Sequence, residues 1–243
     1  IFKDKFPTTT KVMAWGQSLG GIITELMQEK YPELLNVAAP LCVADNISAE
    51  LQMAGDFLWG FKVLFDPSIK GGNYSAGATG YAESMQDLVK VFTVIGKLQA
   101  NIATNNWPDT ASDAGKALAA SGISARSALL MLGLMSGVPA QSAHFDGTTG
   151  PGSVNSSSYT GFALAGSPAL AVLENGATAA ALGVLVTADV EQQSGGAIFD
   201  NSKTNYAARV ASEAAVYNAG LSGATATGGL LAYLAAAPRA TAS

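Results

Sequence analysis

The chain runs Val12-Met13-Ala14-Trp15-Gly16-Gln17-Ser18-Leu19-Gly20-Gly21-Ile22-Ile23-Thr24-Glu25-Leu26-Met27. An apolar run, a glycine-rich turn and a second apolar run predict a strand, a sharp bend and a helix. Glycines that flank a serine allow a tight bend without a Cβ clash, and the serine is then strained and exposed. Ser18 is therefore a candidate nucleophile. The backbone N–H of Leu19, at the positive end of the helix, is a candidate oxyanion donor.

The residues after this turn predict a parallel βαβ unit. Apolar residues recur at helical spacing from Leu19 to Tyr31, and the Tyr31-Pro32 pair ends the helix. The apolar run 36–43 predicts a second strand, so that residues 11–43 form one βαβ unit with Ser18 at the carboxyl end of its first strand. The alternative for residues 16–21 is a structural glycine turn without chemistry.

With these elements the chain resembles secreted bacterial α/β-hydrolases of the esterase and lipase type that carry a large helical insertion. The matching segments are W-G-Q-S-L-G-G at 15–21, K-Y-P at 30–32 and A-P-L-C at 39–42, with weaker matches at 125–130, 137–139 and 234–239. The resemblance implies an α/β fold with a partial hydrolase core at 1–45 and a mainly helical cap at 46–243. It also implies a secreted or extracellular protein.

From about residue 46 the sequence changes to alanine-rich helical periodicity. Helices are expected at 49–64, 79–104, 111–120, 124–136, 168–192 and 203–219. Turn-rich connectors are expected at 71–77 and 148–153, and a boundary inside the cap near 147–158. Six large apolar residues of the cap could line a substrate pocket: Met53, Phe57, Trp59, Phe61, Phe65 and Met85. The i, i+4 spacing of Phe57, Phe61 and Phe65 indicates first a packing face and only second a substrate wall.

A serine triad also needs an acid and a base, and the resembled family orders them after the serine and builds further strands beside the elbow. We expect the chain to be the middle piece of a larger hydrolase, with acid and base supplied by companion polypeptide segments. Within the chain, His144 is the one histidine, and an ordinary loop histidine is favoured over a base. Asp45 follows the second strand and is a candidate acid, although a helix cap is favoured there. Asp109 and Asp113 are expected to be helix-end charges.

Composition limits the other function classes. The formal net charge of −5 gives no basic face for nucleic acid. The chain contains no run of about 18 uninterrupted apolar residues, so the sequence predicts no conventional membrane span. Cys42 is the single cysteine and is expected to be a buried, inert thiol, with pairing to a cysteine on another segment left open. The sequence contains no metal-binding or nucleotide-binding motif, so we expect no cofactor.

The sequence therefore predicts a serine hydrolase that forms an acyl-enzyme at Ser18. The expected substrate is a small ester with a hydrophobic or aromatic part. The alternative is a non-catalytic, hydrolase-like binding or interaction module, in which the elbow persists and no triad forms.

Overall fold

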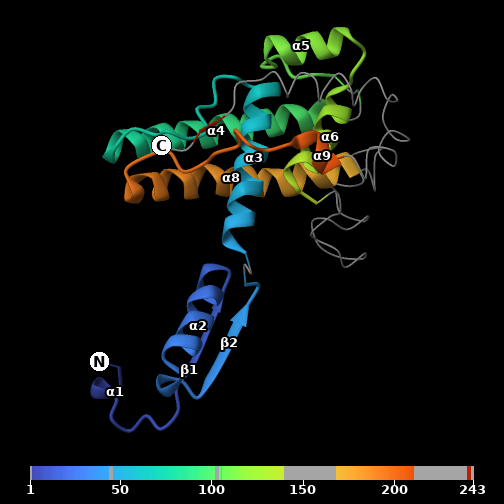
Figure 1. Cartoon of the computed structure of the whole chain (residues 1–243). Helices are drawn as coiled ribbons and strands as arrows, with labels where there is room; N and C mark the ends of the chain where they lie inside the picture. The colour runs from blue at the N-terminus through green and yellow to red at the C-terminus, as the bar shows by residue number, and fades with distance from the viewer. Residues whose placement is uncertain are drawn as a thin grey trace. The chain divides into compact units, whose positions relative to one another are not determined.

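A computed structural model describes residues 2–43, 46–101, 104, 106–139, 168–210 and 240–241. The chain divides into two compact units, Ile1–Glu50 and Leu51–Ser243, whose elements are shown in Figure 1; the predicted division lay after residue 45. The described part is a mixed α/β structure that is mostly helical and contains a two-stranded parallel sheet. A full hydrolase core is not present among these elements.

The first unit is the predicted βαβ arrangement. Its elements are α1 (Phe2–Lys5), β1 (Met13–Gln17), α2 (Leu19–Lys30), the 3-10 turn η1 (Pro32–Leu34) and β2 (Val37–Leu41). The strands are parallel, in a register that pairs Met13 with Val37 and Gln17 with Leu41. Helix α2 packs against both strands. The prediction of a strand, bend, helix and parallel strand is confirmed.

The sheet of this unit is covered on one face only. Alternate side chains point to opposite faces of a strand, and the residues of one face are large, apolar and exposed: Met13 (61%), Trp15 (71%), Val37 (51%) and Leu41 (47%). Among the described residues of the unit, only Gly21, Thr24 and Leu35 are buried. The unit therefore has almost no apolar core of its own.

The second unit has a large helical core. Its helices are α3 (Ile47–Leu64, which begins in the first unit), α4 (Gly77–Asn101), α5 (Asp113–Ala120), α6 (Ala125–Ser136), α8 (Pro168–Ser194) and α9 (Tyr206–Val210). The expected cap helices are confirmed to within a few residues, apart from 211–219, which lies outside the described residues together with the predicted boundary near 147–158. Phe57, Phe61 and Phe65 are 0% exposed and pack ring against ring, with centroids 5.6 and 5.3 Å apart. The packing-face interpretation is therefore confirmed, and these three rings line no surface.

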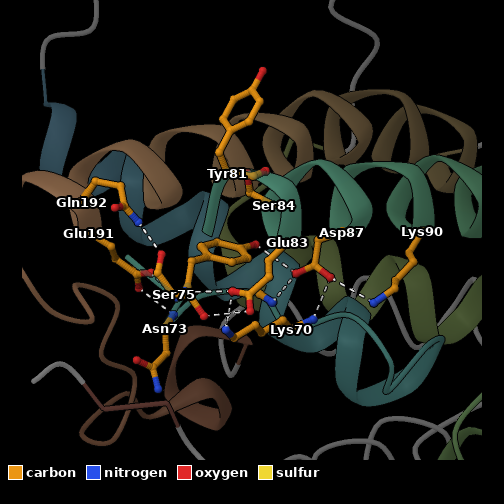
Figure 2. A network of polar contacts seen from close by, with 12 residues as sticks. Lys70, Asn73, Ser75, Tyr81, Glu83, Ser84, Asp87, Lys90, Glu191 and Gln192 are labelled. Carbon is orange, nitrogen blue, oxygen red and sulfur yellow. Dashed lines mark hydrogen bonds and ion pairs between the residues drawn. The ribbon is translucent and has the colours of Figure 1, made fainter. Parts of the chain in front are cut away.

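Residues 66–77, which we call the pinned loop, connect α3 to α4. Four of its residues have positive φ: Gly71 (71°), Gly72 (136°), Asn73 (52°) and Gly77 (66°), the last of which begins α4. Buried carboxylates accept the hydrogen bonds of its backbone N–H groups (Figure 2): Lys70 (3.0 Å) and Gly71 (2.7 Å) donate to Asp87, and Asn73 and Tyr74 (both 2.8 Å) donate to Glu191. The loop thus has a defined conformation because helices α4 and α8 hold its backbone.

One helix of the described part is long and apolar enough to cross a membrane by length and composition. It covers Ala171–Ser194 of α8, with a mean hydropathy of 1.4, and 56% of that apolar window is buried in the structure. Helices α5 and α6 would pass the same test only together, and they are bent by 118°. Helix α8 packs against α4 and α6.

Candidate nucleophile elbow

Ser18 occupies the bend between β1 and α2 with φ 55° and ψ −120°. A residue with a side chain rarely adopts positive φ, and such a conformation costs on the order of 1–3 kcal/mol. Backbone hydrogen bonds hold it: the Ser18 N–H donates to the Leu41 carbonyl (3.0 Å), and the Ser18 carbonyl accepts from Gly21 (2.8 Å) and Ile22 (3.1 Å). The strain is therefore imposed jointly by the neighbouring strand and the first turn of the helix.

Two glycines make this bend sterically feasible. A Cβ on Gly16 would lie 2.2 Å from the Gly20 carbonyl oxygen, and a Cβ on Gly21 would lie 2.7 Å from the Leu41 carbonyl oxygen. A Cβ on Gly20 would meet nothing within 4 Å. The sequence pattern indicated the flanking pair Gly16 and Gly20. The structure requires glycine at 16 and 21 instead, because at these positions another backbone segment approaches.

The polar groups at the bend are available for chemistry. Ser18 takes the N-cap position of α2, yet its side chain makes no capping hydrogen bond. Ser18 is exposed, and its hydroxyl makes no hydrogen bond within the described part of the chain. The Leu19 N–H has no acceptor there either, as expected for the first turn of a helix. A hydroxyl and an oxyanion donor thus lie on adjacent residues at the positive end of a 12-residue helix.

Neither Asp45 nor His144 lies within the described residues. The start of α3 is capped by the next residue, Asn46, whose Oδ1 accepts from the Ala49 N–H (3.1 Å). Asp109 pairs with Lys97 (2.6 Å), and the hydrogen bond from that ammonium holds the pKa of Asp109 below its usual value. The described residues bring no acid or base to Ser18, and no histidine is among them.

Cys42 differs from the prediction of a buried thiol. It is exposed and has φ 48°, because β2 ends at Leu41 and the chain bends there. Since Gln17 pairs with Leu41, Cys42 follows its strand as Ser18 follows the other. The carboxyl ends of parallel strands meet at one edge of the sheet, so an exposed thiol shares this edge with the candidate nucleophile. An apolar run alone did not indicate where the strand would stop.

Within the described ranges, no group of three or more His, Cys, Asp or Glu residues could hold a metal ion. The groups that the described residues place at this edge are the Ser18 hydroxyl, the Leu19 N–H and the exposed Cys42 thiol. The side chains around it are apolar and exposed, with Leu19 at 66% and Leu41 at 47%.

Comparison with known proteins finds no matching protein family, no matching curated sequence and no matching solved structure. The elbow geometry is thus the main basis for a functional interpretation.

Proposed function

We propose that this chain supplies the nucleophile of a serine hydrolase that cleaves carboxylic esters through an acyl-enzyme at Ser18. The observation that carries the proposal is the backbone of Ser18, φ 55° and ψ −120°, between a parallel strand and a helix. A nucleophile elbow has this arrangement because it lifts the serine Oγ above the sheet and beside the helix N-terminus. A structural turn would have no need to strain a serine when glycine fits the same conformation at no cost.

The proposed reaction is acyl transfer. A histidine base takes the proton of Ser18 as Oγ bonds to the ester carbonyl carbon, and the Leu19 N–H donates to the resulting oxyanion. The alkoxide leaves with the proton from the imidazolium, and the acyl group stays on Ser18. Water, activated by the same histidine, then releases the carboxylic acid.

Companion polypeptide segments supply the acid and base in this proposal. Support comes from the sheet of the first unit, where each described strand is paired on one side only. Two strands alone are marginally stable, and one face of this sheet exposes Met13, Trp15, Val37 and Leu41. Additional strands and a covering helix would bury these groups, and loops from such strands reach the edge that carries Ser18.

The side chains beside Ser18 favour an ester with an apolar part. Leu19, the residue after Ser18, is 66% exposed, and burial of an apolar acyl or alcohol group against its side chain is favourable by about 25 cal/mol per Å². The phenylalanines of α3 do not contribute, since they are buried in the core of the second unit.

A non-catalytic, hydrolase-like binding module is the second candidate. The single histidine of the chain, His144, is favoured from the sequence as an ordinary loop residue, and a serine hydroxyl without a base is a weak nucleophile.

Labelling with a fluorophosphonate probe distinguishes the two, because the probe reacts only with an activated serine. The full protein is labelled with and without the Ser18→Ala substitution, and Ser202→Ala, an exposed serine of the second unit, is the matched control. We expect Ser18→Ala to lose labelling and ester turnover by at least about 1,000-fold while Ser202→Ala keeps both. Labelling that survives in Ser18→Ala contradicts the assignment, and an unlabelled wild type with its companion segments present favours the binding module.

A further inference from the structure

A pocket of about 370 Å³ lies in the second unit, far along the chain from Ser18. Its wall combines Lys62 of α3, four residues of the pinned loop, Glu191 of α8 and Phe199 of the segment after α8. Sites for small molecules span roughly 300–1,000 Å³ and join apolar walls to a few polar groups. The size and mixed lining of this pocket suit a small amphiphilic ligand.

Lys62 brings an incompletely paired cation to the pocket. Its side chain is half-buried, and its Nζ donates one hydrogen bond, to the Lys70 carbonyl (2.8 Å). An ammonium has three N–H donors, and no carboxylate forms an ion pair with Lys62 in the described part of the chain. Burial lowers the pKa of Lys62, with the charge of Asp87 opposing that shift. A half-buried cation without an ion pair is stabilised when an anion reaches it.

The nearby carboxylates are already engaged. Glu191 accepts the two backbone hydrogen bonds of Asn73 and Tyr74, and Asp87 accepts from the Tyr74 hydroxyl (3.0 Å) and from the pinned loop (Figure 2). Glu83 pairs with Lys70 (2.6 Å). These contacts fix the backbone of the loop, so the pocket is formed before any ligand arrives.

The rest of the wall combines apolar residues and glycines with the polar residues Asn73 and Thr241. Phe199 packs at the edge of the core and lines the pocket. Gly71 and Gly72 leave backbone exposed there, and the Gly72 N–H donates to no acceptor in the described part of the chain. The wall thus offers an aromatic surface beside an ammonium and a backbone donor.

We propose that this pocket binds a small organic carboxylate, whose oxygens accept hydrogen bonds from Lys62 and whose apolar part lies against Phe199. Glu191 also lines the pocket, and the charge of Asp87 acts on Lys62, so a monoanion fits better than a dianion. One added negative charge would form an ion pair with Lys62, whereas a second would be repelled by these carboxylates.

Titration of the full chain with benzoate, followed by calorimetry and by backbone amide NMR shifts, tests the proposal. We expect saturable binding that shifts the Gly71 and Gly72 amides and weakens by about tenfold or more in Lys62→Met. The matched control Lys116→Met, an exposed lysine of α5, should bind as the wild type does. Benzamide, which has the same ring without the charge, should bind at least about tenfold more weakly than benzoate.

Several outcomes overturn the proposal. These are the absence of saturable benzoate binding to the wild type, equal affinity in Lys62→Met, or equal affinity for benzamide. Displacement of benzoate by equimolar inorganic phosphate assigns the pocket to an inorganic anion instead. If Lys62→Met does not fold, the benzamide comparison and the amide shifts on the wild type decide the question.

Discussion

The elbow at residues 16–21 and the pinned loop at 66–77 both contain a residue with a side chain at positive φ, and they treat it in opposite ways. Asn73 has φ 52° and its N–H donates to the buried carboxylate of Glu191. Ser18 has φ 55° and leaves both its own hydroxyl and the N–H of Leu19 without a partner in the described residues. Strain combined with satisfied donors builds structure, whereas strain combined with free donors is typical of a site that acts on a ligand.

The serines at other helix starts sharpen this contrast. Ser112 and Ser124 cap α5 and α6 with ordinary backbone angles, and their hydroxyls accept from Gly115 and Ser127. Ser18 has the same position on α2 but a backbone that prevents capping. The same residue type at the same helix position therefore caps a helix in the second unit and leaves its hydroxyl without a partner among the described residues in the first.

The largest expected effect is the difference in labelling between two glycine substitutions in the elbow. Gly16→Ala places a Cβ 2.2 Å from a backbone oxygen, so the bend cannot form as it is. We expect fluorophosphonate labelling of Ser18 to fall by at least about 100-fold, because displacement of a nucleophile by about 1 Å can cost that much. Gly20→Ala is the matched control, since its Cβ meets nothing within 4 Å, and it should label as the wild type does. Equal labelling of the two variants would contradict the elbow geometry.

The next effect concerns the pinned loop, where the donors are satisfied. Asp87 is 1% exposed and accepts from Lys70, Gly71, Tyr74 and Lys90. Asp87→Ala removes the acceptor of the buried Tyr74 hydroxyl and of the Lys70 and Gly71 N–H groups, and we expect the free energy of unfolding of the second unit to fall by about 3–5 kcal/mol. Urea denaturation measures it.

Asp189→Ala is the control for this prediction. Asp189 lies on the exposed side of α8, where its carboxylate accepts from Gln193, and its removal should change stability by less than about 0.5 kcal/mol. If Asp87→Ala has as small an effect as Asp189→Ala, the pinned loop does not depend on its carboxylates.

These two regions also differ in how far the sequence could predict them. The elbow was predictable because its signal is local: an apolar run, glycines around a serine and a helical period within 16 residues. The choice between Gly20 and Gly21 was not, because it depends on the Leu41 carbonyl of the next strand. The pinned loop was expected only as a connector at 71–77. Its partner Glu191 lies 118 positions after Asn73 in the chain, and no local pattern relates the two.

Helix periodicity predicted the second unit well, since burial of apolar helix faces contributes most of the stability of a core of this size. It gave no information on exposure at strand ends. Cys42 was expected inside a strand, and the positive φ that exposes it arises where β2 stops beside the elbow. The acid and base of the triad stay predictions, because Asp45 and His144 lie outside the described residues.

A smaller effect compares the serines directly. Ser112→Ala and Ser124→Ala each remove a helix cap, and we expect each to cost about 1 kcal/mol of stability. Ser18→Gly removes a side chain from a strained position and should stabilise the first unit by about 1 kcal/mol while it abolishes labelling. Hydrogen exchange of the amides in α2, α5 and α6 measures the three effects in place. Loss of protection in α2 after Ser18→Gly would mean that Ser18 is a structural cap after all.

The smallest effect comes from pH. Glu83 accepts from the Lys70 ammonium (2.6 Å) and from the Ser75 N–H (2.8 Å) and hydroxyl (2.9 Å). The hydrogen bond from Lys70, followed by those from Ser75, lowers the pKa of Glu83 to about 2. Because this value lies below the unfolded value of about 4.3, the carboxylate stabilises the folded state fully above about pH 4.3, and that contribution is lost as the pH falls toward 2.

Glu83→Gln should therefore reduce stability at pH 6 and have almost no effect at pH 2, as thermal denaturation at both pH values would measure. A constant difference between wild type and variant across this range would mean that the ionised carboxylate does not hold the loop. Since the elbow has no such acid among its described contacts, reactivity lost as the pH falls through about 6.5 would instead report the proposed histidine base.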